Sequence, residues 1–216
     1  MLKRKKLRHN EYYDMQSHFD SLYAQSANGH NFYGLLDIMQ SEENIRLAYR
    51  NVKRNTGSKT AGYDGSTIED IKRLSVSKVV STIQRMFEHY TPQAVRRVFI
   101  PKANGKTRPL GIPTIWDRLF QQCILQVLEP ICEAKFYKHS YGFRPNRNTH
   151  HAKARFETLI NRACLYHCVD VDIKGFFDNV NHAKLIKQMW AMGIRDKALL
   201  SIISRLLKAE IIGEGF

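Results

Sequence analysis

Residues 166–182 read Tyr166-His-Cys-Val-Asp-Val-Asp-Ile-Lys-Gly-Phe-Phe-Asp-Asn-Val-Asn-His182. The first half alternates like a β-strand, with Asp170 and Asp172 on one face and the apolar side chains on the other. Gly175 ends the strand, and Asn181 is placed to cap a following helix. The pattern presents the carboxylate of Asp172 at a strand end, beside backbone carbonyl groups. Hard divalent cations prefer oxygen ligands of this kind.

The aspartates of this stretch allow several interpretations. A single aspartate at the end of a strand is most often a solvated acid. Asp170-Val171-Asp172 also fits the Asp-x-Asp motif of metal-dependent glycosyltransferases, although the sequence lacks the neighbouring motifs that such an enzyme needs. The longer string from Asp172 to His182 is far more specific than these three residues.

The chain is strongly basic. Its 216 residues include 34 Lys and Arg against 20 Asp and Glu, a net charge of +14, which indicates a polyanionic partner such as nucleic acid. A hydrophobic content of 43% excludes a disordered protein. The cysteines have neither the pattern of a disulfide framework nor the spacing of a zinc finger. No apolar run approaches the roughly 20 residues of a membrane span. We therefore expect a soluble protein of the reducing cytoplasm, without a membrane partner.

Cations gather in segments with few or no acids. The amino-terminal run carries Lys3, Arg4, Lys5 and Lys6, and a glycine-rich loop, which we expect to be mobile, carries Lys53, Arg54 and Lys59. Residues 95–112 predict a β-hairpin around an Asn-Gly turn, with Arg96, Arg97, Lys102, Lys106 and Arg108. In the segment 135–155, which has no acid, Arg144 and Arg147 alternate with aromatic residues. Basic and aromatic side chains together suit contact with the backbone and bases of a single strand.

Helix starts are predicted where a capping residue precedes an apolar stripe. The candidate caps are Ser41, Ser66 with Glu69, and Thr114 with Asp117. The helix after Thr114 carries apolar residues on adjacent rows, so we expect it to be buried.

Several strings occur in the order found in the group II intron reverse transcriptases, the family that this sequence resembles. Asn55–Gly65 resembles the glycine-rich segment near the start of those proteins, Arg96–Thr114 the first fingers motif, Ser140–Pro145 the second, and Asp172–Asp178 the first catalytic-aspartate motif. The resemblance runs from about residue 41 to the end. The strings Arg-Pro-Leu-Gly-Ile-Pro and Tyr-Gly-Phe-Arg-Pro make it closest to the bacterial intron-encoded reverse transcriptase/maturases.

The resemblance implies an α+β fold: a reverse-transcriptase fingers/palm fragment, helix-rich, with a basic β-hairpin and a partial antiparallel palm sheet. It divides the chain into a basic amino-terminal helical extension (1–55), the fingers (56–163) and an incomplete palm (164–216).

It also implies roles for individual residues. Asp172 is similar to the first catalytic aspartate, which with the carbonyl of Ile173 would bind Mg²⁺, two ions being needed by the complete enzyme. Lys102 and Arg108 would contact the triphosphate of the incoming dNTP, Arg108 through its forked guanidinium. Phe177 would lie under the sugar and exclude a 2′-hydroxyl, with Phe176 as the neighbouring core aromatic.

The remaining cations would bind nucleic acid, as the resemblance implies. The partners would be the intron RNA, an RNA template and a DNA primer. The residues concerned are Lys3, Arg4, Lys5, Lys6, Lys53, Arg54, Lys59, Arg96, Arg97, Lys106, Arg144 and Arg147.

The sequence departs from the family after Asp178. It contains neither a Pro-Gln-Gly segment nor a Tyr-x-Asp-Asp hairpin. One carboxylate cannot hold two divalent ions. We therefore expect the protein to be the RNA-directed DNA polymerase of a group II intron, which also assists intron splicing and mobility. We expect this chain to be inactive on its own. The alternative is a non-catalytic intron-RNA-binding splicing factor on the same scaffold. An incomplete palm would expose apolar surface, which makes a homodimer a further expectation.

Overall fold

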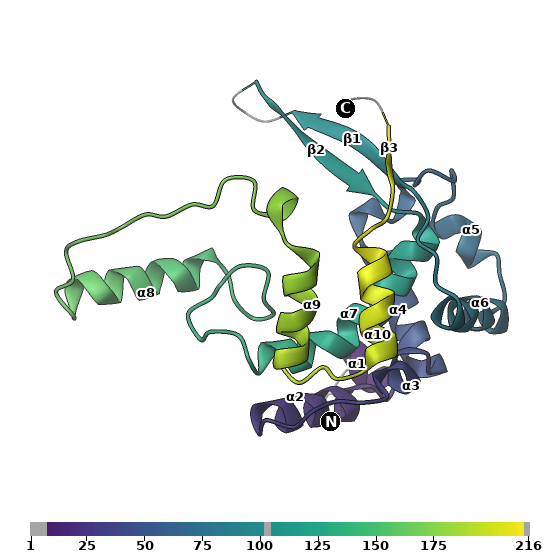
Figure 1. The fold of residues 1–216 in the computed structure, drawn as a ribbon, viewed down its shortest axis with the longest axis horizontal. Coiled ribbons are helices and arrows are strands. Elements are labelled where there is room, and N and C mark those ends of the chain that lie inside the picture. Colours follow the sequence, from purple (N-terminus) through teal and green to yellow (C-terminus); the bar gives the residue numbers. More distant parts are fainter. Residues whose placement is uncertain (1–7, 102–104, 214–216) are drawn as a thin grey trace, which may run out of the picture.

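The computed structural model describes residues 8–101 and 105–213. A helical core carries two projections, a β-hairpin and a long arm, that leave it in different directions (Figure 1). The helices are α1 (His9–Tyr12), α2 (Gln16–Ala27), α3 (Leu35–Met39), α4 (Glu42–Arg54), η1 (Thr56–Lys59), α5 (Ile68–Lys72), α6 (Val76–Glu88), α7 (Ile115–Glu133), α8 (Thr149–Asn161), η2 (Phe177–Asn179), α9 (His182–Ala191) and α10 (Lys197–Leu206). The strands are β1 (Val95–Pro101), β2 (Thr107–Ile112) and β3 (Ile211–Ile212).

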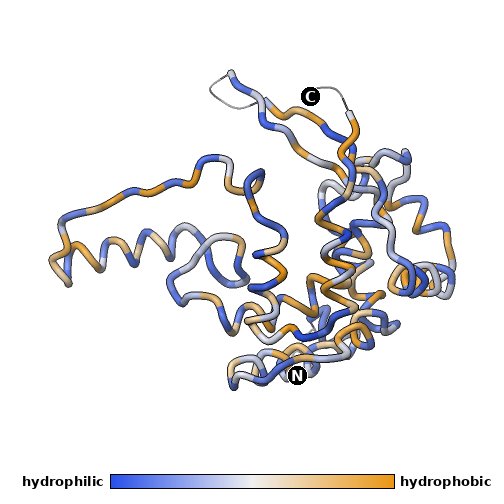
Figure 2. Tube along the Cα trace, in the orientation of Figure 1, coloured by the Kyte–Doolittle hydropathy of each residue, from blue (hydrophilic) through white to orange (hydrophobic). Residues whose placement is uncertain are grey.

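Helix α7 is the centre of the core. Helices α2, α3, α4 and α6 all contact it, and Figure 2 shows the apolar residues concentrated where these helices meet. Leu119, Cys123 and Val127 recur at helical spacing and are fully buried. Burying one such side chain stabilises the fold by about 1.5–3 kcal/mol. The prediction of a buried helix after Thr114 is confirmed.

Polar side chains fix how α4 lies on α7. The Asn44 amide donates to the carbonyl oxygens of Met39 (2.8 Å) and Cys123 (3.1 Å). Gln126 donates to the Asn44 carbonyl oxygen at 2.7 Å and accepts from Asn51 at 3.2 Å. Because Asn44 and Gln126 are buried, a shift of either helix would leave these groups without partners, at a cost of about 1–3 kcal/mol each.

The carboxylate of Asp117 joins the start of α7 to the chain that enters β1. It accepts hydrogen bonds from the Tyr90 hydroxyl (2.9 Å), the Gln93 amide (3.1 Å) and the Thr114 hydroxyl (3.0 Å). Burial raises the pKa of this carboxyl, and the three hydrogen bonds partly offset that rise. The same burial, with Asp117 close by, raises the pKa of Tyr90.

The predicted caps agree with the structure at three helices and differ at one. Ser41, Thr114 and Asn181 cap α4, α7 and α9 with their side-chain oxygens. The predicted capping box of Ser66 with Glu69 is wrong by one residue. Thr67 caps α5, and the Thr67 amide donates to the Asp70 carboxylate at 2.8 Å. Ser66 instead donates its amide to Asp64 in the preceding turn.

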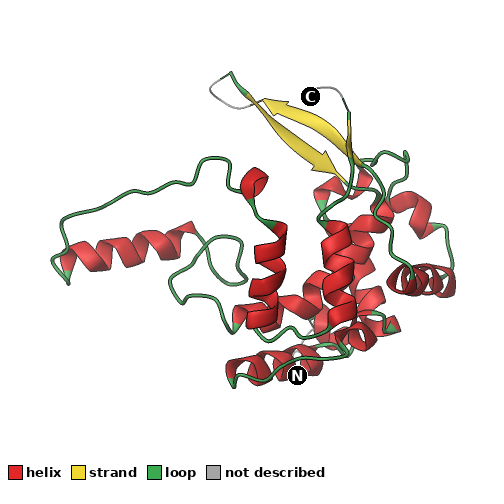
Figure 3. Cartoon of the chain, in the orientation of Figure 1, coloured by secondary structure: helices red, strands yellow, loops and turns green. Residues whose placement is uncertain are grey.

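The sheet has the strand order β2-β1-β3. β1 pairs antiparallel with β2, from Arg96 opposite Ile112 to Pro101 opposite Thr107. β3 pairs parallel with the base of β1, Val95 opposite Ile211. Figure 3 shows the hairpin projecting from the helices, with β3 beside its base.

The strand expected at residues 166–173 does not form, so the partial antiparallel palm sheet is not confirmed. This segment runs extended from α8 toward η2, without a paired strand among the described residues (Figure 3). The exposed fractions of Val169 and Val171 are 86% and 79%. A strand is stabilised by cross-strand pairs and by a covering layer, and the described chain places neither beside this segment.

Replacing Tyr90 with Phe tests the Asp117 network. The ring can stay stacked on Phe120, while the carboxylate loses one donor, so the free energy of unfolding should fall by about 1–3 kcal/mol at pH 7. The hydrogen bond from the Tyr90 hydroxyl favours the ionised form of the Asp117 carboxyl. Its removal therefore raises the folded-state pKa of Asp117 further above the unfolded value of about 3.9. The loss of unfolding free energy should therefore shrink as the pH falls through these two pKa values, because the carboxyl is then protonated in both the folded and the unfolded state.

Urea denaturation at pH 7 and pH 4 measures this difference. Tyr49→Phe is the control, because its hydroxyl has no carboxylate partner of this kind in the described structure and should change stability little at either pH. An equal loss at both pH values for Tyr90→Phe would contradict the argument.

Candidate nucleic-acid interface

The glycine-rich loop, residues 55–65, is held against the start of α7 by two arginines. Arg118 donates to the carbonyl oxygens of Gly57 (2.8 Å) and Thr60 (2.6 Å). Arg96 donates twice to the carbonyl oxygen of Ala61, at 3.2 and 2.8 Å. The carbonyl groups of Gly57, Thr60 and Ala61 are thus bonded to α7 and β1, and the expectation of a mobile loop stays a prediction.

Gly62 brings the loop backbone directly onto the N-terminus of α7. A Cβ atom at this position would lie 2.6 Å from the Thr114 Cα and 2.8 Å from the Thr114 amide nitrogen. The close approach of two backbones requires a residue without a side chain. The glycine is therefore explained by packing, and the loop presents its cations from a fixed position.

The cations in and just before this loop lie on the surface: Lys53 and Arg54 end α4, and Lys59 ends η1. Lys53, Arg54 and Lys59 are exposed. Lys53 lies over the ring of Tyr49, 5.7 Å from its centroid, and Arg54 contacts the ring of His9. Their side chains are long and exposed, so their charge is available to phosphate groups.

The hairpin presents a different set of cations. Lys106 and Arg108 are exposed on or next to β2, whereas Arg97 on β1 is only partly exposed. Arg96 is committed to Ala61, so the structure gives it an internal contact that the sequence did not indicate. Lys102 lies outside the described residues, as do Lys3, Arg4, Lys5 and Lys6.

Arg144 is placed inside the protein. Its guanidinium forms an ion pair with Glu133 at 2.8 Å and donates to the carbonyl oxygens of Tyr137 (2.8 Å) and Ser140 (3.1 Å). A direct contact with nucleic acid would require these bonds to break. Arg147 is partly exposed, donates to the Lys138 carbonyl oxygen at 2.6 Å and lies over the Tyr141 ring.

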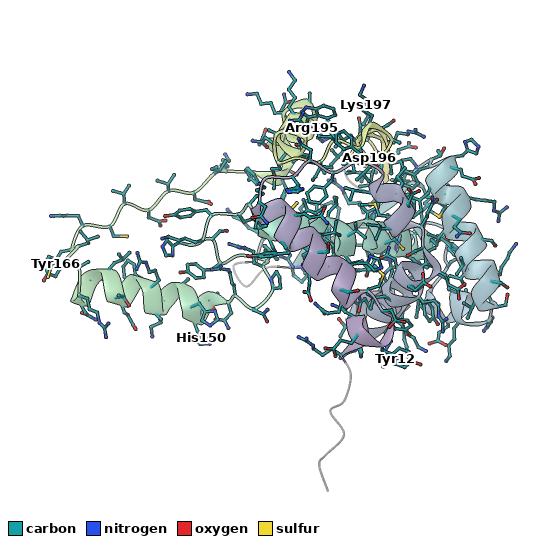
Figure 4. All side chains as sticks on the ribbon, turned by 90° about the horizontal axis from the view of Figure 1, so that it is seen from below. Tyr12, His150, Tyr166, Arg195, Asp196 and Lys197 are labelled. Atoms are coloured by element: carbon teal, nitrogen blue, oxygen red, sulfur yellow. The ribbon has the colours of Figure 1, made fainter. Side chains whose placement is uncertain are left out.

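Asp172 and Ile173 lie in the extended segment of the arm, which we define as residues 149–176. Both are exposed, and Figure 4 shows the arm, with Tyr166 at its far end, reaching away from the helical core. Arg108 is on β2 of the hairpin and Asp172 is on the arm, and Figure 1 shows the hairpin and the arm as separate projections of the helical core.

The turn after Asp172 is well ordered by local bonds. Gly175 has a φ of +60°, and its carbonyl oxygen accepts from the Asn179 side chain at 2.8 Å and the Asn179 amide at 3.1 Å. Phe176 and Phe177 follow with their rings edge to face, 5.7 Å between centroids. The exposed fraction of the Phe177 side chain is 83%.

The described residues do not form a complete metal site. Among them, no three His, Cys, Asp or Glu side chains lie together so that they could hold an ion. The Asp172 carboxylate and the Ile173 carbonyl oxygen are ligands of the type that Mg²⁺ takes, but they amount to a fraction of a coordination shell. These two groups therefore fit part of a magnesium site.

Comparison with known proteins shows which family this chain is similar to. Residues 100–215 match the family model described as reverse transcriptase (RNA-dependent DNA polymerase). The chain is 34% identical over 185 residues to Protein YkfC of Escherichia coli (strain K12), covering 84% of this chain and 48% of that protein. It is 37% identical over 164 residues to the Group II intron-encoded protein LtrA of Lactococcus lactis subsp. cremoris, covering 76% and 26%.

A eukaryotic relative matches over a longer part of the chain. The Putative COX1/OXI3 intron 1 protein of Saccharomyces cerevisiae is 28% identical over 197 residues, covering 91% of this chain and 23% of that protein. The chain thus spans about half of one of these relatives and about a quarter of the other two. The resemblance drawn from the sequence strings is confirmed. In the part of the chain that the structure describes, no helix has the length and apolar composition needed to cross a lipid bilayer.

Gly62→Ala tests how the glycine-rich loop is held. The new Cβ would overlap the backbone of Thr114, so either the loop or the start of α7 must move, and the free energy of unfolding should fall by about 1–3 kcal/mol. Gly57→Ala is the matched control in the same loop, because a Cβ at Gly57 meets no atom within 4 Å. Urea denaturation compares the two. Equal stabilities would show that the loop does not depend on its contact with Thr114.

Proposed function

Because this chain belongs to the reverse transcriptase (RNA-dependent DNA polymerase) family, we propose that it supplies the fingers and the first catalytic aspartate of a group II intron-encoded polymerase. The observation that supports this most strongly is that a single family match covers the end of β1, all of β2, the loop of Arg144 and the Asp172 segment. The parent activity would copy intron RNA into DNA and would assist splicing and mobility of that intron.

Asp172, Ile173 and Phe177 form the proposed catalytic contribution of this chain. Mg²⁺, when bound, would supply charge that stabilises the transferring phosphoryl group. The Asp172 carboxylate and Ile173 carbonyl oxygen would hold part of its shell. Phe177 is fixed five positions later by the Asn179 turn, so its exposed ring is available to lie against the sugar of a nucleotide.

The hairpin is the proposed site for the triphosphate of a dNTP. Arg108 is exposed on β2, and its planar guanidinium can bind two phosphate oxygens at once. Lys102, which lies outside the described residues, would add a second charge. The hairpin leaves the helical core as a two-stranded ribbon, so both strands can follow a polyanion without displacing core side chains.

The remaining exposed cations are proposed to bind intron RNA and the template–primer duplex. Lys53 and Arg54 would act from the end of α4, and Lys59 from the anchored glycine-rich loop. Arg97 and Lys106 would act from the hairpin, and Arg147 from the segment between α7 and α8. Lys3, Arg4, Lys5 and Lys6 would add affinity without reading sequence. Arg96 and Arg144 would act by holding these surfaces in place.

We propose that the 216-residue chain does not polymerise by itself. A two-ion site needs several carboxylates within reach of both metals, and after Asp178 the only acids are Asp196, Glu210 and Glu214. Asp196 is committed as the cap of α10, accepting from the Leu199 amide at 3.0 Å. As the second candidate function we propose a non-catalytic intron-RNA-binding splicing factor on the same scaffold, and the exposed apolar side chains of the arm make a homodimer part of either proposal.

Asp172→Ala separates a metal ligand from a structural residue. In the complete intron-encoded protein, primer extension on an RNA template should fall by at least about a hundredfold, while RNA affinity of the 216-residue chain stays within about twofold, since the exposed carboxylate contacts no core group. Asp170→Ala, on the same exposed segment, is the control and should keep most activity. A parallel loss of RNA affinity in Asp172→Ala would argue against the metal role.

Lys59→Gln tests whether the anchored loop contacts phosphate. Loss of one phosphate contact should weaken RNA binding and reduce the slope of log K against log salt concentration by about 0.7–0.9. Arg73→Gln, an exposed arginine outside the cationic segments, is the control and should leave the slope unchanged. Fluorescence anisotropy over a salt series gives both quantities. Equal slopes for Lys59→Gln and the unmodified chain would place the RNA elsewhere.

A further inference from the structure

The loop between α7 and α8 is built around the buried guanidinium of Arg144. The ion pair with Glu133 attaches it to the last turn of α7, and the bonds to the carbonyl oxygens of Tyr137 and Ser140 close the chain around it. The guanidinium also lies 5.4 Å from the centroid of the Phe136 ring. We call residues 136–147 the Arg144 loop.

A second set of contacts holds the other side of the Arg144 loop. Arg147 donates to the Lys138 carbonyl oxygen at 2.6 Å and lies 5.8 Å from the centroid of the Tyr141 ring. The Tyr141 hydroxyl and the His139 ring are hydrogen bonded at 3.3 Å. The loop is therefore tied internally at several points.

Phe143 is the residue that these ties project into solvent. Its exposed fraction is 104%, the highest among the exposed large hydrophobic residues of the described chain. Its φ of +53° lies in the left-handed region, which is unfavourable for a bulky side chain. Such a backbone persists only where the surroundings determine it, and residues of this kind concentrate at binding sites.

The surroundings of Phe143 are cationic. From residue 134 to 156 the sequence has six Lys or Arg and no acid, and the nearest preceding acid, Glu133, is paired with Arg144. Partial burial, together with Arg155, Lys138 and Arg147, lowers the pKa of His139. The cations around Phe143 can bind the phosphate of a nucleotide while the ring stacks on the base of that nucleotide. Such stacking does not depend on which base is present.

We propose that Phe143 is a stacking platform for an unpaired base of bound RNA, and that Arg144 is the residue that positions it. The proposal rests on the RNA binding proposed above and adds the residue that contacts a base. A flat protein surface fits less well as the occupant, because a single ring among cations offers little apolar area. Duplex RNA fits less well too, since its bases are already stacked on one another.

The test compares Phe143→Ala and Phe143→Trp in the full 216-residue chain, with a single-stranded RNA oligonucleotide that contains one 2-aminopurine. Phe143→Ala should weaken binding at least about fivefold with an unchanged salt slope, because no charge is lost. Phe143→Trp should keep the affinity, since an indole ring also stacks. Quenching of 2-aminopurine fluorescence should occur with the unmodified chain and with Phe143→Trp, and be lost with Phe143→Ala.

Arg144→Gln tests the positioning role. It should reproduce the loss of RNA affinity expected for Phe143→Ala. The double variant should bind no more weakly than either single variant, because both changes abolish the same stacking contact. Tyr33→Ala is the matched control: its exposed fraction is 68%, it lies outside the cationic segments, and RNA affinity should not change. Circular dichroism establishes that each variant is folded.

The outcomes separate the two proposals. If the unmodified chain binds RNA with salt dependence and Phe143→Ala binds equally well and still quenches 2-aminopurine, the stacking platform is wrong and the proposed function stands. If the unmodified chain shows no salt-dependent RNA binding, the proposed function and the platform are both wrong. If Phe143→Ala weakens duplex RNA and single-stranded RNA to the same extent, base stacking is wrong and a backbone contact takes its place.

Discussion

The carboxylate of Asp117 connects three parts of the molecule through one buried group. Its bonds to Tyr90, Gln93 and Thr114 set where α6 ends, where the chain turns toward β1, and where α7 begins. The next residue along α7, Arg118, then holds the glycine-rich loop, and Gly62 rests on Thr114. The direction of the hairpin and the position of the loop therefore both depend on the first turn of α7, which explains why a costly buried acid is found there.

The arginines of this chain divide into those that organise and those that present charge. Arg96, Arg118 and Arg144 donate to backbone carbonyl groups of loops, and each uses the width of a guanidinium to reach two acceptors or one acceptor twice. Arg108 and Arg54 are exposed. A lysine could serve at the exposed positions, but a single ammonium group could not reproduce the contacts of Arg118 or Arg144. Net charge alone thus overstates how many cations are available to nucleic acid.

Local patterns in the sequence predicted local structure well. The caps at Ser41, Thr114 and Asn181 and the burial of α7 follow from spacing and side-chain chemistry over a few residues. The prediction of a strand at residues 166–173 failed, because alternation only shows which side chains share a face, whereas a strand also needs a neighbouring strand. The internal roles of Arg96 and Arg144 were equally hidden, since a sequence shows that a residue is charged but not that a carbonyl group or Glu133 lies beside it. The sequence shows Phe143 as an aromatic residue among cations, but its exposure and its left-handed backbone conformation depend on the fold of the surrounding loop.

The short parallel contact between β1 and β3 affects the order in which the molecule can be assembled. It joins Val95 to Ile211, and a second bridge joins Phe32 to Ile194, so both ladders close across more than a hundred residues of intervening chain. Loop closure over such distances is slow compared with helix formation. On the ribosome, α2, α4 and α7 can pack as soon as residue 133 has emerged, whereas the base of the hairpin stays open on one edge until Ile211 and Ile212 are made. During that interval the hairpin edge is a ready template for pairing with other chains, and a chaperone that covers it would act at that stage of synthesis.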